Sequence, residues 1–349
     1  SFPSQTSDFS YQFPIISIPS VTLCRKMMLS YKNIINKIDQ LEEANIILSA
    51  LEFNVFSVLE KKSLRAKQVA SLTKTKLEGM EILLNALAAM GVLNKNKNTF
   101  RNTPVTYKHF CQTSPDFKIG TVMLKMDSRG EYEKLSKIIK KGRDPKEFES
   151  KDDPEFRHLF TYAMHERSVL SASKVADVVN QSKIGKLLDL GCGPGSYTAA
   201  ILKKDKVATA TLMDRAAAIK VARKICKTQS VYNRLHFVSG DLFDDEFGEG
   251  YDTVLLSNII HIYNARENKT IFKKINKALK KGGRFVLYDL FLNNSKTEPY
   301  DATLFAITML LYTKAGKLYT FGEAEALLRN AGFAHIKKKK IGDGSSIIE

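Results

Sequence analysis

A glycine loop with apolar residues on its N-terminal side is the strongest chemical signal in the chain. Residues 189–195 read Asp-Leu-Gly-Cys-Gly-Pro-Gly, follow Leu187-Leu188 and precede a helix-like stretch at 196–204. Glycine lacks a Cβ, so this backbone can turn sharply against a ligand, and the free N–H groups of a helix start favour an anion. A nicotinamide or flavin fingerprint needs G-x-G-x-x-G, and Ser196 stands where the last glycine belongs. The loop therefore argues against a dinucleotide.

A carboxylate stands at the end of the next predicted strand. Asp214 follows the apolar run 208–213 and lies 23 residues after Gly191. A nucleotide-binding α/β unit places a ribose-binding acid at about that distance, and a carboxylate can accept both protons of a ribose diol. The alternative is an N-cap for a helix that begins near Ala216. We expect a ribose contact.

The third predicted strand, 235–239, leads to a second acid. Asp241 can accept a hydrogen bond from an adenine amino group, and Leu242 and Phe243 can cover the ring. The following acids, residues 244–246, raise the alternative of a metal site. Consecutive acids in one loop usually point in different directions, so we predict no metal.

A histidine follows the fourth predicted strand. His261 lies just past residues 253–257, on the side where open α/β sheets bind ligands. An unperturbed imidazole titrates near pH 6.5 and can take a proton at neutral pH, although a histidine can also simply be bonded within its loop. Asp289, near the end of the strand predicted at 284–290, can orient the other ring nitrogen or only bond local backbone. We predict both as catalytic residues.

Alternating strands and helices fill the C-terminal half of the chain. The predicted strands lie near 186–190, 208–213, 235–239, 253–257, 284–290 and 333–340. This alternation predicts a doubly wound parallel sheet, and residues 345–349 are expected to return as an antiparallel strand after the turn at 342–344. In such a sheet the loops described above meet at one edge.

The N-terminal half has the pattern of a winged helix. Apolar residues recur at helical spacing from Tyr31 to Leu59, a second helix is predicted at 77–90, and a polar turn at 94–98 separates two short extended pieces. A helix as apolar as LEGMEILLNALAAM favours packing in a core or a dimer over reading base edges. The pattern of residues 115–180 predicts further helices, with a hinge or helix start at 151–154.

Length and composition limit the function classes. A chain of 349 residues predicts two domains, and 44% hydrophobic residues can supply their cores. The net charge of +17 raises nucleic-acid binding as an alternative, but the excess is mainly lysine and spreads over both halves. The four cysteines are scattered, which is typical of free thiols in a reducing compartment. No apolar run is long enough for a membrane span.

The first 26 residues differ from the rest in composition. They are rich in Ser, Pro and Phe, contain one acid, Asp8, and precede Met27-Met28. We interpret residues 1–26 as a leader or extension outside the fold. A cytoplasmic location is expected, with organelle import as the alternative if this segment is a transit-type leader.

These elements in this order resemble the small-molecule O-methyltransferase family, which depends on S-adenosylmethionine (SAM) and includes hydroxyindole, caffeate, chalcone-type and bacterial antibiotic and carotenoid methyltransferases. The likeness covers about residues 28–349. It implies a mainly α winged-helix dimerisation domain at 27–150, which forms a homodimer. It also implies an α/β, Rossmann-like class I methyltransferase domain at 151–349, beginning with linker helices at 151–180.

The resemblance also implies a site. SAM, with S-adenosylhomocysteine as its product, would be bound by Asp189, Gly191, Gly193, Gly195, Asp214, Arg215, Asp241, Leu242, Phe243 and Ser257. His261 matches the general base of the family, and Asp289 falls where plant members carry a supporting Glu. The candidate acceptor-binding residues are Phe160, Met164 and His165 in the linker and Phe305, Met309 and Tyr312 on one helical face. That face can equally be plain core.

The chain departs from the family pattern beside its histidine. Ile262 and Tyr263 replace the Asp and Trp that usually follow, and Phe321 stands where plant members have a second supporting Glu. Glu323 lies two residues later. The expected brace of His261 is therefore incomplete and would depend on Asp289.

We predict transfer of a methyl group from SAM to a hydroxyl of an aromatic or polyketide-like acceptor. One alternative is a relative with different chemistry: C-methylation, decarboxylation or hydroxylation. Another is a nucleic-acid methyltransferase or winged-helix regulator, against which stands the run Ser257-Asn258-Ile259-Ile260 after strand four, which is unlike the N/D-P-P-Y loop of amino-methylating DNA enzymes.

Overall fold

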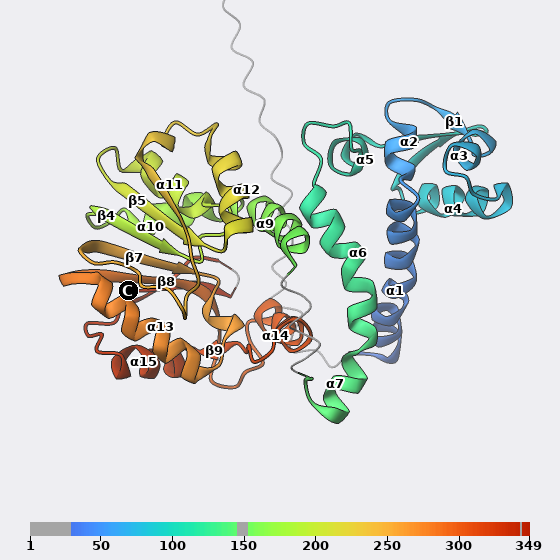
Figure 1. Cartoon of the computed structure of the whole chain (residues 1–349). Helices are drawn as coiled ribbons and strands as arrows, with labels where there is room; N and C mark the ends of the chain where they lie inside the picture. The colour runs from blue at the N-terminus through green and yellow to red at the C-terminus, as the bar shows by residue number, and fades with distance from the viewer. Residues whose placement is uncertain (1–28, 145–152, 343) are drawn as a thin grey trace, which may run out of the picture. The chain divides into compact units, whose positions relative to one another are not determined.

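The computed structural model describes residues 29–144, 153–342 and 344–349. The predicted leader, residues 1–26, and part of the helix start predicted at 151–154 lie outside them. The chain divides into two compact units, residues 1–49 and 50–349. In the first unit the structure describes residues 29–49, and nearly all of these belong to helix α1, Tyr31–Glu52 (Figure 1). The last residues of α1 belong to the second unit.

The predicted winged-helix pattern is present after α1. Its elements are α2 (Val55–Leu59), β1 (Leu64–Arg65), α3 (Ala66–Leu72), α4 (Leu77–Ala89), β2 (Leu93–Asn96) and β3 (Thr99–Asn102). The three strands form an antiparallel sheet in the order β1-β3-β2. The turn predicted at 94–98 is shorter than expected, because Asn96 pairs with Thr99 and only Lys97-Asn98 lie between the strands.

Helix α4 packs through one apolar stripe. Met80, Leu84 and Leu87 are buried at i, i+4 and i+7, while Ile82 is exposed. This is the packing that the apolar composition of the helix predicted.

Helices fill the segment between the small sheet and the large one, as predicted for residues 115–180. They are α5 (Pro104–Phe110), α6 (Ile119–Glu133), α7 (Leu135–Lys141), α9 (Pro154–Ser168) and α10 (Ala172–Val179). Asp153 caps α9 by accepting hydrogen bonds from the N–H groups of Glu155 and Phe156. The predicted helix start is thus found at this residue.

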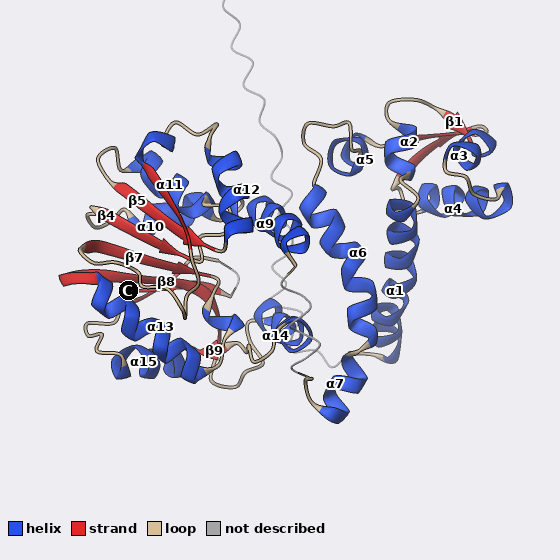
Figure 2. Cartoon of the chain, in the orientation of Figure 1, coloured by secondary structure: helices blue, strands red, loops and turns tan. Residues whose placement is uncertain are grey.

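The large sheet has the order β10-β11-β8-β7-β4-β5-β6, with β9 paired to β8. Figure 2 shows β5, β4, β7 and β8 side by side in this order. Its strands are β4 (Lys186–Leu190), β5 (Thr209–Asp214), β6 (Leu235–Ser239), β7 (Tyr251–Ser257), β8 (Leu279–Leu292), β9 (Tyr319–Thr320), β10 (Lys338–Lys340) and β11 (Ser345–Ile348). The pairs from β6 to β8 are parallel, and β11 returns antiparallel between β8 and β10, as predicted.

Two strand predictions differ from the structure in length. The strand predicted at 333–340 is reduced to its last three residues, because Phe333 and Ile336 pack against the core beside α15. The strand predicted at 284–290 begins earlier, since Tyr251 pairs with Leu279 across an irregular register that takes in residues 281–283.

Helices cover both faces of this sheet. They are α11 (Ser196–Lys204), α12 (Ala216–Cys226), α13 (Ala265–Ala278), α14 (Tyr300–Tyr312) and α15 (Phe321–Asn330). Neighbouring strand residues point to opposite faces: Leu187 packs with α10, α11 and α12, and Leu188 packs with α13 and α15 (Figure 1). This double layer is the predicted doubly wound α/β fold, and it leaves the carboxyl ends of the strands free to carry a site.

Candidate active site

The glycine loop joins β4 to α11. Gly191, Gly193 and Gly195 all have left-handed φ angles, of +61°, +51° and +73°. The N–H groups of Gly191 and Cys192 donate to the carbonyl of Met213, which ties the loop to β5. A Cβ on Gly191 would lie 2.5 Å from Ile259 Cδ1, whereas a Cβ on Gly193 would meet nothing within 4 Å. The loop therefore packs against the segment after β7 and leaves open space at Gly193.

Asp189 is buried under this loop at 1% exposure. Its Oδ2 accepts a hydrogen bond from Thr198 Oγ1 at 2.6 Å, and its Oδ1 has no partner among the described residues. Burial raises the pKa of Asp189 to about 7, against the lowering effect of the Thr198 hydroxyl, and the nearby charge of Asp214 adds to the rise.

Asp214 holds the loop from the end of β5. Its Oδ2 accepts a hydrogen bond from Gly193 N at 2.7 Å, and its Oδ1 accepts one from Arg215 N. The pKa of Asp214 is raised by burial, although these N–H groups and the charges of Arg157 and Arg215 act in the opposite direction. Helix α12 has Arg215 as its N-cap residue and no side-chain cap, so Asp214 does not have the alternative role of capping that helix.

The residues after β6 lie beside this carboxylate. Asp241 Oδ2 forms an ion pair with Arg215 at 3.0 Å, and its Oδ1 accepts a hydrogen bond from Phe243 N. The ring of Phe243 meets the ring of Tyr263 edge-on at 5.0 Å, while Leu242 is largely buried in the core. Phe243 is thus the more accessible of the two residues predicted to cover an adenine.

The segment after β7 carries the histidine. Ser257 ends the strand at 7% exposure, and Asn258 turns the chain with a left-handed φ of +56°. A short 3-10 turn, η3 (Ile260–Ile262), then holds His261 at the carboxyl edge of the sheet. His261 as a whole residue is only 6% exposed.

His261 and Asp289 are in direct contact. His261 Nδ1 lies 2.6 Å from Asp289 Oδ1, which also accepts a hydrogen bond from Leu290 N, and Asp289 is fully buried in β8. In a neutral imidazole that donates from Nδ1 to this carboxylate, the lone pair lies on Nε2. Of the two roles left open for Asp289, the contact with the imidazole is therefore present.

The missing second brace is replaced by packing. Phe321 stacks on Phe291 with ring centroids 4.6 Å apart. Glu323 accepts a hydrogen bond from Thr320 N and forms ion pairs with Lys296 and Lys317, so its carboxylate is engaged at the start of α15. Phe321 has no hydrogen-bonding group, and the hydrogen bonds and ion pairs of the Glu323 carboxylate within the described residues are with Thr320, Lys296 and Lys317.

The residues predicted on α14 separate from one another. The ring of Phe305 stands perpendicular to the His261 ring at 5.1 Å. Met309 is buried in a small core with Leu292 and Leu318. Burial raises the pKa of Tyr312, and the acidic residues of α6 add to the rise, so Tyr312 faces α6. Only Phe305 is brought to the histidine.

The residues predicted on α9 also divide. Phe160 stacks on Phe156 at 6.0 Å, and Met164 is half-buried. His165 Nδ1 instead lies 2.8 Å from Ser196 Oγ at the start of α11. His165 and Ser196 line a cavity of about 310 Å³ between α9, α10, α11 and α12, whose lining includes neither His261 nor Asp289.

Arg157 was missed by the sequence analysis. Burial raises the pKa of both Asp214 and Tyr263, that of Tyr263 to about 12, and the charge of Arg157 opposes the rise in each. Arg157 lies seven residues before Met164 on α9, and residues at that spacing share a helix face. That spacing was the available signal.

The described residues contain neither a metal-binding cluster nor a membrane-spanning helix. No group of three or more His, Cys, Asp or Glu side chains is arranged to hold a metal ion among them. In the same part of the chain, no helix has the length and apolar character needed to cross a membrane.

Comparison with known proteins gives the family. A model of the O-methyltransferase domain matches residues 138–334, and a model of the O-methyltransferase dimerisation domain matches residues 39–109. The chain is 27% identical to the 3-hydroxy-5-methyl-1-naphthoate 3-O-methyltransferase of Streptomyces sahachiroi, over 83% of this chain and 86% of that protein.

Solved structures agree in fold. An O-methyltransferase family protein from Burkholderia thailandensis superposes with a TM-score of 0.82 at 24% identity, over 92% of this chain and 98% of that one. Human N-acetylserotonin methyltransferase in complex with SAM gives 0.77 at 21% identity, over 93% and 97%. The chain therefore belongs to the O-methyltransferase family and is a SAM-dependent methyltransferase with a dimerisation domain.

Proposed function

We propose that this protein methylates a hydroxyl group of a small aromatic or polyketide-like acceptor, with His261 as the general base. The observation that carries the proposal is the buried contact between His261 Nδ1 and Asp289 Oδ1 at 2.6 Å. His261 lies two residues after Ile259, against which the glycine loop packs. Because the contact uses Nδ1, we assign proton removal to Nε2, at the carboxyl edge of the sheet where α/β folds bind their ligands.

The residues at this edge fit SAM. The open space at Gly193, the unpartnered Oδ1 of buried Asp189 and the carboxylates of Asp214 and Asp241 supply close backbone approach and hydrogen-bond acceptors. Gly191, Gly195, Arg215, Leu242, Phe243 and Ser257 complete the proposed binding set. When bound, SAM supplies a methyl group on a sulfonium that is its own leaving group.

The protein's part in the reaction is positioning and proton removal. Asp289 holds the imidazole in one tautomer, and the burial of both side chains keeps water from competing for Nε2. Alignment of the reacting atoms can contribute about 7–11 kcal/mol at best, and a general base typically adds about 10²–10⁴-fold.

The acceptor class follows from the apolar side chains near His261. Phe305 lies against the imidazole, and we propose that Phe160 and Met164 extend this wall. Met309 and Tyr312 are left out of it, because Met309 packs in a small core and Tyr312 faces α6. Relatives named for a hydroxynaphthoate and for tetracenomycin support a flat aromatic acceptor. We leave His165 outside the site because of its bond to Ser196.

The partner and location proposals rest on other features. We propose a homodimer formed through the dimerisation domain, supported by exposed apolar residues on α1. Cys111, Cys192 and Cys226 are free thiols, which supports a reducing compartment such as the cytoplasm.

The test uses SAM with an isotope-labelled methyl group and a panel of phenols, naphthols and polyketide-like aromatics. His261→Ala should lower turnover by about 10²–10⁴-fold and leave SAM affinity, measured by calorimetry, within about twofold. Asp214→Ala should instead weaken SAM binding. Turnover unchanged in His261→Ala would remove His261 as the base, and no heat with SAM on folded protein would end the proposal.

C-methylation is the second candidate. A relative named L-tyrosine C(3)-methyltransferase is 26% identical over 52% of this chain. Mass spectrometry of the labelled product separates the two outcomes, because a methyl ether and a C-methyl group fragment differently.

A further inference from the structure

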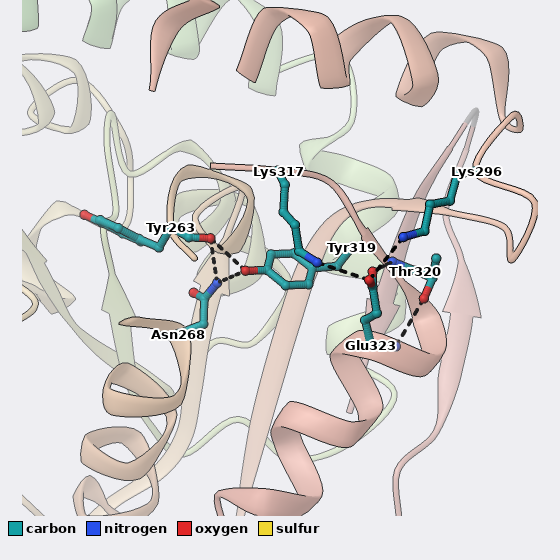
Figure 3. Close-up of polar contacts among 7 residues, drawn as sticks. All are labelled: Tyr263, Asn268, Lys296, Lys317, Tyr319, Thr320 and Glu323. Carbon is teal, nitrogen blue, oxygen red and sulfur yellow. Dashed lines mark hydrogen bonds and ion pairs between the residues drawn. The ribbon is translucent and has the colours of Figure 1, made fainter. Parts of the chain in front are cut away.

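The backbone carbonyls of the turn that carries His261 are held by side chains from other elements. Ile260 O accepts a hydrogen bond from Asn268 Nδ2 at 2.8 Å. Tyr263 O accepts hydrogen bonds from Tyr319 Oη at 2.7 Å and from Asn268 Nδ2 at 3.2 Å (Figure 3). These two carbonyls flank His261. One amide and one phenol therefore fix both ends of the turn.

Asn268 is placed for this contact by the start of α13. Asn264 and Glu267 form a reciprocal capping box that fixes the first turn of the helix, and Asn268 follows at 0% exposure. Its Nδ2 also donates to Tyr319 Oη at 3.0 Å, while its Oδ1 has no partner in the described parts of the chain. Only the NH₂ end of an amide can face two carbonyl oxygens, so the chemistry fixes its orientation.

Tyr319 is placed by the strand that carries Asp289. It lies in β9 at 1% exposure and pairs in register with Phe291, two residues beyond Asp289 in β8. Burial raises the pKa of Tyr319 to about 12, so its hydroxyl remains a donor at physiological pH. Strand β8 thus supports the His261 turn in two ways: it carries Asp289, and it pairs with the strand that holds Tyr319.

The start of α15 anchors Tyr319 on its other side. Thr320 and Glu323 form a capping box, and Lys296 and Lys317 both approach the Glu323 carboxylate, at 3.4 Å and 3.1 Å (Figure 3). Lys317 Nζ also lies 4.7 Å from the centre of the Tyr319 ring.

Gly316 packs closely against the middle of the turn. A Cβ on Gly316 would lie 2.3 Å from His261 O and 2.9 Å from Ile262 O, so no larger residue fits there without a shift. Gly316 O accepts a hydrogen bond from Arg143 Nη2 at 2.7 Å, and Arg143 Nε donates to Leu310 O. All four carbonyls from Ile260 to Tyr263 are therefore in contact with packed elements.

We propose that Asn268 and Tyr319 are positioning residues for His261, and that they hold the catalytic turn rigid in a chain whose second carboxylate brace is replaced by Phe321. The inference rests on the proposed role of His261 as base. Both residues act through the backbone of the turn and neither touches the reacting atoms.

Tyr319→Phe tests this with little change in volume. We expect the turnover number to fall about tenfold or more, because displacements of about 1 Å at a catalytic group are costly, while the SAM dissociation constant and the acceptor KM stay within about twofold. Tyr251→Phe removes the same hydroxyl from a buried tyrosine at the opposite end of β7 and should keep wild-type turnover. Asn268→Leu, which is similar in volume, should reproduce the loss.

The His261→Ala background separates positioning from general damage. There Tyr319→Phe should cause no further loss, because the group that it positions is gone. NMR of the His261 ring nitrogens in the protein without SAM gives an independent readout: the signals should move in Tyr319→Phe and stay in Tyr251→Phe.

Two results would overturn the proposal: wild-type turnover in Tyr319→Phe, or an equal loss in both backgrounds. Failure of the proposed function is a different result, namely full activity of His261→Ala itself. If Asn268→Leu does not fold, the Tyr319→Phe comparison still decides.

Discussion

The buried carboxyl group of Asp189, beneath the glycine loop, makes the stability of the fold depend on pH. Burial raises its pKa to about 7, far above the value in an unfolded chain. Below about pH 4 the Asp189 carboxyl group is protonated in both the folded and the unfolded state. Between about pH 4 and pH 7 it ionises in the unfolded chain and stays largely protonated in the folded one. The stability contributed by the protonated form is therefore lost as pH rises through this window.

Asp189→Asn, which cannot ionise, should remove this pH dependence. We expect the free energy of unfolding of the wild type to fall relative to the variant between about pH 4 and pH 7, by at most about 1.4 kcal/mol per pH unit. Urea unfolding at about pH 4.5, 6 and 8 measures the difference.

Asp205 supplies a control of opposite sign. The N–H of Ala208 lowers the pKa of Asp205, so its contribution is present at neutral pH and is lost as pH falls. A wild-type-minus-variant difference for Asp189→Asn that does not change with pH would contradict the assignment.

At the scale of elements, α6 and α9 cross in close contact. An ideal Cβ on Gly120 would lie 2.1 Å from Ala163 N and 2.5 Å from Ala163 Cα. Glu166 of α9 accepts hydrogen bonds from the N–H groups of Gly120 and Thr121, which caps the start of α6. The crossing sets the position of α9, which carries Phe160 and Met164.

Gly120→Ala should therefore force the two helices apart. We expect a loss of about 1–3 kcal/mol in the free energy of unfolding, measured by thermal or urea denaturation, because backbone atoms cannot rotate away from the new methyl group. Gly130→Ala lies on the same helix with nothing within 4 Å of its Cβ and should gain about 0.5–1 kcal/mol. Equal effects of the two substitutions would rule out the close crossing as the cause.

The elements that the sequence predicted best are those with a local signal. The alternation of Leu187 and Leu188 between the two faces follows from strand periodicity, and the position of Asp214 follows from the end of the apolar run that forms β5. The sequence placed His261 just past β7 and Asp289 in the C-terminal part of β8, and their side chains are in contact because parallel strands bring their carboxyl ends together.

What the sequence could not predict depends on contacts between distant segments. Asn268 and Tyr319 meet across 51 positions in sequence, and no local pattern marks either. Phe305, Met309 and Tyr312 have one helical spacing but three environments, because the elements packed around α14 differ along its length. The hydrogen bond of His165 could not be predicted for the same reason, since its partner Ser196 lies on α11.

At the scale of the whole molecule, a dimerisation domain precedes the methyltransferase domain on one chain. Helix α1 exposes large apolar side chains on one of its faces. Ile34, Ile38 and Leu41 recur at i, i+4 and i+7 and are 48%, 59% and 64% exposed in the single chain. Large apolar side chains gathered on one helix face are typical of an interface.

We predict that the double variant Ile38→Lys, Leu41→Lys weakens the dimer. Four apolar side chains per dimer would be replaced by charges, and a loss of about 3 kcal/mol of association energy corresponds to more than a hundredfold in the dissociation constant. Sedimentation velocity at low micromolar concentration should therefore find a monomer for the variant and a dimer for the wild type. Val207→Lys, at a residue 87% exposed in the methyltransferase domain, should remain a dimer. A double variant that sediments like the wild type would show that α1 does not form the interface.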